Sequence, residues 1–528
     1  MHSVTKQLIL LVLLMVSFTS LSAQEYWSKA EAQDLDSFFS PQEQTGSAWM
    51  WQPQQWEQLR PQPVTAQVQS LRIPNEAGVL EHFDLVAVDV LSPDLQRKHP
   101  QIQTYVGQSQ TREDVTARIT ITPLGVSAWL HLPNHENFFI QPQKQTNGLH
   151  WAYKRQASSS EIFRCKTDAR KALKSDVLAA RTAKSSSLND GLKTFRIAVT
   201  TTGEYTQFWN DGDDTNGTAT ADALAAVVNT LNRVNEVFEV DLGIHLELVS
   251  GESILFEDPT TDPFNTNLNA ETQSTLTEYI GEANYDVGHL FDYASESSGD
   301  AGCIGCVCDD NQKGQGYSIH SFTSSSGPYM SDYFDLDYVA HELGHQFGAT
   351  HTFSHNNEGY GTNVEPGSGT SIMGYAGITG SNNVQLHGDP YFHAASIKNI
   401  LDNVNDTSCY STSAINNTAP VVDAGPDYAI PKVTAYELKA EATDAEGDVL
   451  YYNWEQMDDG EVTNETFGPN NYVGAQARSV APTASATRSI PNTEAVLAGT
   501  LTEENPNVNS NWETVSLVGR LLNWSVTV

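Results

Sequence analysis

The feature that most constrains the fold is the run 341–351, which reads HELGHQFGATH. His341 and His345 are four residues apart, so on an α-helix both imidazoles leave the same face and can bind one metal ion. Gly348 can adopt the positive φ that ends a helix, which lets His351 return as a third ligand. Three protein ligands leave a fourth coordination position open, as in catalytic zinc sites. The run therefore predicts a zinc helix with an open position.

Glu342 lies next to the first predicted ligand, on a helix that we expect to start near Asp335 or Asp337. Its carboxylate would stand beside the open position, where it can accept a proton from an attacking water. We therefore expect hydrolysis by water that the zinc ion activates, with Glu342 as general base. Two alternatives remain, an extracellular adhesion or binding protein with a catalytically idle zinc domain and a hydrolase acting on a bond other than a peptide bond. The intact base argues against the first alternative.

The run resembles the zinc helix of metzincin metallopeptidases. In that family a methionine turn follows the third histidine, and residues 371–375, Ser-Ile-Met-Gly-Tyr, are similar to that turn. The resemblance implies an endopeptidase that uses zinc and acts on protein or peptide substrates. It also implies that Met373 forms an apolar floor beneath the metal. In astacin-like and serralysin-like members a tyrosine placed like Tyr375 touches zinc or stabilises the oxyanion, so Tyr375 is a candidate catalytic residue.

Within the metzincins, residues from about 195 to 409 are most similar to bacterial reprolysin-like, adamalysin-related secreted proteases. The similarity includes residues 365–370, which precede the turn. Thr352 and Ser371 depart from the pattern, because reprolysins carry Asp and Cys there. Pappalysin-like enzymes, which can show a His-Thr-Phe sequence like that at 351–353, are an alternative within the same clan.

The N-terminus has the pattern of a signal peptide. Lys6 precedes an apolar run that ends at Val16, and small residues follow up to Ala23. We therefore expect residues 1–23 to be a signal peptide and the protein to be secreted, to the medium or the cell surface. No later segment is long and apolar enough to be transmembrane. Acidic residues outnumber basic ones by 65 to 28, which argues against nucleic acid as a partner.

The odd number of cysteines suggests a latent precursor. An exported chain meets an oxidising compartment, and five cysteines leave one thiol unpaired. Cys165 stands alone ahead of a basic linker at residues 166–191, so its thiolate could occupy the open zinc position until an activating protease cuts the linker. This resembles the cysteine switch of metzincin precursors, with a disulfide or an inert thiol as alternatives. Residues 24–190 are thus predicted to be an inhibitory, β-rich pro-domain that includes the linker.

The remaining cysteines are disulfide candidates: Cys303, Cys306, Cys308 and Cys409. They allow three pairings, and the sequence does not choose among them. The three clustered cysteines could also suggest a second zinc site, but export favours disulfides. A bond from this cluster to Cys409 would fix the end of the catalytic domain.

Strand and helix patterns complete the predicted multidomain fold. Residues 191–412 alternate strand and helix patterns, which predicts an α/β domain, and the resemblance adds a mixed sheet. Residues 413–528 are predicted to be a linker followed by an immunoglobulin- or cadherin-like all-β sandwich. Asp444 and Asp448 there could bind calcium or form a hydrogen-bonded turn. Because the sequence stops inside a predicted strand, we expect that it is truncated.

Overall fold

The computed structural model describes residues 26–31, 46–52, 69–132, 136–143, 148–155, 164–167, 191–322 and 331–528. The predicted signal peptide and residues 168–190 of the basic linker lie outside the described residues. Among the helices that are described, none is long and apolar enough to cross a membrane.

The N-terminal region forms one antiparallel sheet among its described strands. Its order is β1-β2-β9-β8-β7-β6-β5-β4-β3. The strands are β1 (Trp27–Lys29), β2 (Gly46–Trp51), β3 (Gln69–Pro74), β4 (Leu80–Ala87), β5 (Gln103–Ser109), β6 (Thr116–Thr122), β7 (Gly125–His131), β8 (Asn137–Pro142) and β9 (Leu149–Lys154), with the short helix α3 (Pro93–Lys98) after β4. This agrees with the β-rich region that the sequence predicts. We call β1–β9 the N-terminal sheet.

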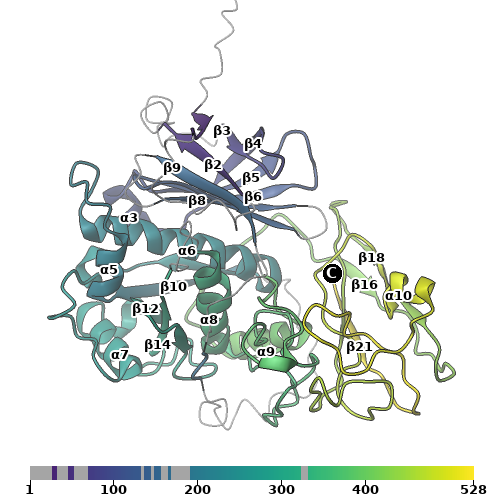
Figure 1. Ribbon diagram of the computed structural model, residues 1–528. Coiled ribbons are helices and arrows are strands. Elements are labelled where there is room, and N and C mark those ends of the chain that lie inside the picture. Colours follow the sequence, from purple (N-terminus) through teal and green to yellow (C-terminus); the bar gives the residue numbers. More distant parts are fainter. Residues whose placement is uncertain are drawn as a thin grey trace, which may run out of the picture.

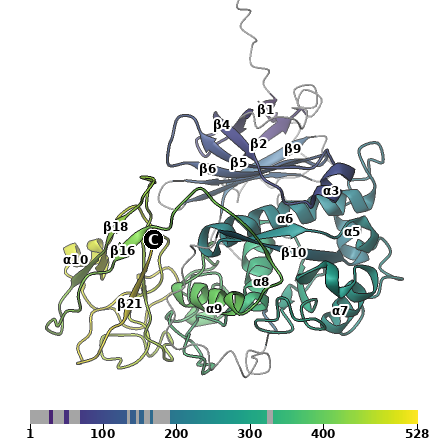
Figure 2. The same ribbon diagram turned by 180° about the vertical axis from the view of Figure 1, so that it is seen from behind.

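Side chains alternate between the two faces of the N-terminal sheet, and buried residues on the two faces belong to different cores. Leu71, Phe83 and Ile119 belong to a core of the sheet's own. Phe139 and Tyr153 belong to the main core of the next domain. One face of the sheet is therefore an interface. Figures 1 and 2 show this sheet lying along the helix α6.

Residues 192–413 contain a mixed sheet in which β10, β11, β12 and β14 are parallel and β13 is an antiparallel edge. Its strands are β10 (Leu192–Thr201), β11 (Ile244–Leu248), β12 (Val287–Tyr293), β13 (Ser298–Asp300), β14 (Gly316–His320) and β15 (Ser411–Ser413). The helices are α5 (Gly203–Trp209), α6 (Ala219–Leu242), α7 (Leu268–Tyr279), α8 (Ala340–Phe347) and α9 (Ala394–Asn405). The predicted α/β class is confirmed at this level.

The long helix α6 has clear start and stop signals. The Thr218 side chain accepts a hydrogen bond from Ala221 N, which caps the first turn. Gly243 follows the helix with φ 62°, the left-handed conformation that glycine takes readily. Apolar residues on three- and four-residue steps bury α6 between the mixed sheet and the N-terminal sheet.

The zinc-motif helix starts earlier than the sequence suggests. Asp335 and Asp337 look like N-terminal capping residues, but helical structure already begins at Asp332, and a π-helical stretch at Phe334–Val339 leads into α8. Asp335 is buried, and its carboxylate accepts a hydrogen bond from Arg233 Nη1 at 2.7 Å. The Asp335 carboxylate therefore forms an ion pair with Arg233 of α6 instead of capping the helix.

The C-terminal region differs from the expected sandwich. Its strands are β16 (Val421–Asp423), β17 (Tyr436–Lys439), β18 (Glu441–Thr443), β19 (Asn453–Gln456), β20 (Thr487–Ile490) and β21 (Trp524–Thr527), with one short helix, α10 (Thr493–Ala498). They pair as three separate two-stranded sheets, β16-β18, β17-β20 and β19-β21. Each of these strands has three or four residues, and long loops connect most of them.

These loops attach the C-terminal region to the domain that contains the mixed sheet. Val462, Phe467 and Trp512 form a small core with Val384. Gly367 N also donates to Val462 O at 2.8 Å. At the predicted calcium or turn position, Asp444 Oδ1 accepts hydrogen bonds from two backbone amides at 3.0 and 2.8 Å, so the turn accounts for this side chain.

Candidate metal centre

The structure brings together the four predicted metal ligands. The ligand atoms of Cys165, His341, His345 and His351 all lie within 4.8 Å of one another. His345 Nε2 is 3.0 Å from His351 Nε2 and 3.7 Å from Cys165 Sγ. The three histidines are buried and Cys165 is half-buried. Two histidines come from α8, one from the turn after it, and the cysteine from a segment far away in sequence.

Gly348 makes that turn possible in the way the sequence predicts. Its φ is 122°, a conformation that other residues adopt rarely. A Cβ atom at this position would also lie 2.8 Å from the Cβ of Asn403. Both the backbone angle and the close approach of α9 therefore require glycine here.

Hydrogen bonds orient the histidines for metal binding. His341 and His345 place Nδ1 at 2.6 and 2.8 Å from backbone carbonyl oxygens, so each Nδ1 carries the proton and each Nε2 has a lone pair. His351 Nδ1 lies 3.0 Å from the Glu358 carboxylate. Such outer partners are typical of metal-bound histidines. Burial lowers the pKa of His341 to about 3, which keeps this imidazole neutral.

The donor set fits a zinc ion. The facing Nε2 atoms of His345 and His351 would repel each other as two lone pairs at 3.0 Å, and a cation between them removes that conflict. Three imidazoles and one thiol have the number and softness that zinc prefers. Among the described residues, this is the one group of His, Cys, Asp and Glu side chains that lie close enough together to hold an ion.

Glu342 is buried beside the histidines, and it is hydrogen-bonded to a residue that sequence reasoning missed. Thr167 Oγ1 donates to Glu342 Oε2 at 2.9 Å. Burial, together with the negative charge of Asp300, raises the pKa of Glu342 to about 8. The signal for Thr167 was present, because it is two residues from Cys165 and side chains i and i+2 of an extended segment point the same way.

Residues Arg164–Thr167, the 164–167 segment, lie along the edge of the mixed sheet. Cys165 forms a parallel β-bridge with Gly299 of β13. Lys166 N donates to Gly299 O at 2.7 Å, and Gly299 N donates to Arg164 O at 3.0 Å. The segment thus extends the sheet by one short strand, a common way to bind an extended peptide.

The predicted methionine turn packs against α8. Met373 is buried, and a Cβ added at Gly344 would lie 2.7 Å from its Sδ, so the thioether touches the helix backbone between the two histidines. The ring of Tyr375 lies 4.5 Å from that of His351, centroid to centroid. Its hydroxyl forms a hydrogen bond with Cys165, and burial raises its pKa above the ordinary value. Met373 therefore contacts α8 between the two histidines, and Tyr375 lies beside His351 and Cys165.

Glu365 belongs to the run before the methionine turn that sequence reasoning included in the resemblance, but its role was missed. This buried carboxylate accepts hydrogen bonds from Thr352 Oγ1 at 2.6 Å and from Ser371 N at 3.2 Å. It therefore joins the segment after the third histidine to the methionine turn. Thr352 and Ser371 are the two departures from the reprolysin pattern, and here a shared carboxylate connects them.

The four remaining cysteines form two disulfides, Cys303–Cys306 and Cys308–Cys409. The second bond ties the cluster to the end of the domain, across 101 residues of sequence. With these pairs made, the cluster is not a second zinc site, and Cys165 remains a free thiol.

One comparison with known proteins identifies this domain. Residues 191–411 match the family model described as metallo-peptidase family M12B, reprolysin-like. No curated protein matches the chain significantly. The matched range runs from β10 to β15 and includes α8 and the methionine turn, so it favours a reprolysin-like over a pappalysin-like domain. Residues 191–411 therefore belong to the reprolysin-like family of zinc metallopeptidases, family M12B.

Proposed function

We propose that the protein is a secreted zinc-dependent endopeptidase made as a latent precursor. Residues 24–190 inhibit the metallopeptidase domain until a protease cuts the basic linker. The observation that carries this proposal is the position of the 164–167 segment, which brings Cys165 to the three histidines and Thr167 to Glu342. The chain's own segment thus fills the places that water and substrate need.

The residues have separate roles in the proposed reaction. His341, His345 and His351 hold the zinc ion, which when bound polarises a peptide carbonyl and makes water a better nucleophile. Glu342 accepts the proton of the attacking water and passes it to the leaving amine. The Tyr375 hydroxyl, once Cys165 has left, is close enough to the histidines to donate to the developing oxyanion.

The substrate backbone has a ready partner in β13. Gly299 offers both its N–H and its C=O to the 164–167 segment, and the same groups can pair with a bound peptide. A Cβ at Gly299 would lie 2.4 Å from Glu342 Oε1. Glycine therefore lets the peptide approach the general base closely, which is consistent with an endopeptidase that binds extended chains.

The decisive experiment measures casein or gelatin hydrolysis by the exported, processed protein with and without chelator. We expect the Glu342→Ala variant to retain zinc and to lose roughly 10²–10⁴-fold in rate, the usual contribution of a general base. Glu278→Ala, at an exposed site on α7, is the matched control and should keep full activity. Activity that survives both chelation and Glu342→Ala would refute the proposal. A protein that holds zinc but hydrolyses no peptide would favour the adhesion alternative.

A further inference from the structure

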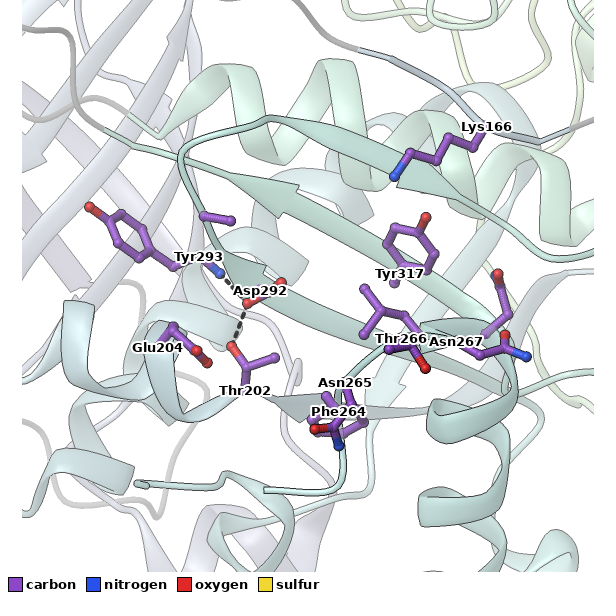
Figure 3. Close-up of a pocket in the computed structure, with 13 residues that line it drawn as sticks. Lys166, Thr202, Glu204, Phe264, Asn265, Thr266, Asn267, Asp292, Tyr293 and Tyr317 are labelled. Carbon is purple, nitrogen blue, oxygen red and sulfur yellow. Dashed lines mark hydrogen bonds between the residues drawn. The ribbon is translucent and has the colours of Figure 1, made fainter. Parts of the chain in front are cut away.

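A pocket of about 360 Å³ lies next to the 164–167 segment (Figure 3). It is formed where β10 and β12 end, by the loop before α7 and by Tyr317 of β14. Lys166 stands at its margin. The metal ligands are not part of its wall, so this pocket is separate from the metal centre.

The pocket is negatively charged. Asp292, at the end of β12, accepts hydrogen bonds from Thr202 Oγ1 at 2.6 Å and from Tyr293 N at 2.7 Å. Glu204, in the first turn of α5, lies close enough for its charge to raise the pKa of Asp292, in addition to the larger effect of burial. Lys166 is the one cation among the residues that line the pocket. Asp292 and Glu204 therefore face this space, and apart from Lys166 no cationic side chain is among the residues that line it.

Lys166 already occupies the margin of this space. Its Nζ lies 5.8 Å from the centroid of the Tyr317 ring, within the range of a cation–π contact. Its positive charge also acts on Asp300 of β13. Cys165 and Thr167 point to the metal centre, and the residue between them points the other way, as alternation in an extended segment requires. Lys166 therefore reaches across β13 toward the pocket.

We propose that this pocket is a substrate subsite that selects a lysine or arginine side chain. The inference rests on the proposed peptidase function, because it assumes that substrate replaces the 164–167 segment along β13. A peptide in that position places one side chain at the metal centre and the adjacent one over the pocket. A long cationic side chain can stack on Tyr317 while its charge approaches Asp292 and Glu204. A glutamate in its place would meet two like charges.

The test compares peptides that differ at one position. The processed full-length protein is assayed on a set of fluorogenic peptides with Lys, Gln or Glu placed singly at each of the positions flanking the cut bond. At one position we expect Lys to be preferred over Gln by about tenfold in kcat/KM, mainly through KM. Glu204→Gln and Asp292→Asn should each lower this ratio severalfold, whereas Glu278→Gln, on the exposed side of α7, should not change it.

Two outcomes overturn the proposal. One is equal cleavage of Lys and Gln peptides at every position, and the other is a Lys preference that persists in both variants. If no peptide of any kind is cleaved, the proposed function fails. The role of the pocket is then tested separately, by measuring with fluorescence anisotropy how tightly labelled Lys and Gln peptides bind to the zinc-loaded protein. Equal affinities refute it, and tighter binding of the Lys peptide that depends on Glu204 supports it.

Discussion

The N-terminal region contacts the metallopeptidase domain at two places that differ in size and chemistry. The N-terminal sheet covers α6 with a broad face that includes aromatic residues and the buried ion pairs of Arg118 with Glu236 and Glu239. The 164–167 segment is short, yet it reaches the three histidines and Glu342. The difference suggests a division of tasks, in which the sheet supplies affinity and the segment supplies inhibition.

The broad contact also includes ion pairs with the start of the helix that continues into α8. Arg155, directly after β9, pairs with Asp332 and with Asp337. Tyr153 donates a further hydrogen bond to Asp332 at 2.6 Å. Burial raises the pKa of Asp337 to about 6, although the Arg155 charge opposes that shift. The sheet therefore fixes the start of this helix, ten or so residues before His341.

The largest expected effect comes from removing the Cys165 thiol, which we propose to be inhibitory. Cys165→Ala leaves the broad contact intact but opens the fourth ligand position, so the uncut precursor should gain roughly a thousandfold in peptide cleavage, the scale of a lost intramolecular ligand. The rate is measured on precursor whose linker is shown intact by mass spectrometry. The double variant with Glu342→Ala should return the rate to background. A Cys165→Ala precursor that stays latent would mean that the sheet itself blocks the domain.

The second prediction tests the broad contact alone. Arg155→Ala leaves Asp332 and Asp337 buried without their cation, which costs about 3 kcal/mol, so the N-terminal piece left after linker cleavage should bind roughly a hundredfold more weakly. Its dissociation is measured by surface-plasmon resonance or by size-exclusion chromatography. Arg97→Ala, which breaks an exposed pair with Asp94, is the matched control and should have little effect. Unchanged dissociation in Arg155→Ala would remove the proposed role of the sheet.

The parts of this arrangement that the sequence could predict are local. His341 and His345 share a helix face because of their spacing, and Gly348 is needed wherever a chain reverses so soon after a helix. Cys165 follows from counting and position, since five cysteines leave one thiol unpaired and Cys165 stands apart from the other four. The strands and the helix of the mixed sheet follow from their apolar periodicity. Each of these inferences needs only a few neighbouring residues.

The parts that the sequence could not predict depend on tertiary contacts. No sequence pattern near Glu365 indicates that its carboxylate will accept hydrogen bonds from Thr352 and Ser371, which lie on either side of it in the chain. The helix start was misplaced because Asp335 looks like a cap but pairs with Arg233 of α6. The C-terminal strands alternate like those of a sandwich, yet their loops pack on the catalytic domain around Val384. Local sequence patterns predict helices and strands, but they do not predict which parts of the chain pack against them.

The smallest predicted effect separates the two contacts of the 164–167 segment from each other. Thr167 accepts a hydrogen bond from Ala301 N at 2.8 Å and donates one to Glu342 at 2.9 Å. Thr167→Val keeps the shape of the side chain and removes both bonds, at a cost of about 1–2 kcal/mol. Because Cys165 stays in place, we expect the uncut precursor to leak only about tenfold more activity than the wild type.

The conservative variant decides whether the hydroxyl or the fold is responsible. Thr167→Ser retains the Oγ that Glu342 accepts from, so its precursor should be as latent as the wild type. If the serine variant leaks as much as the valine variant, Thr167 matters for packing and not for its hydrogen bond to the general base. If Thr167→Val matches Cys165→Ala in activity, the segment acts as one unit whose two contacts cannot be separated. Leakage in the valine variant alone would assign the thiol and the hydroxyl separate shares of latency, so the narrow contact would itself contain a major and a minor inhibitory group.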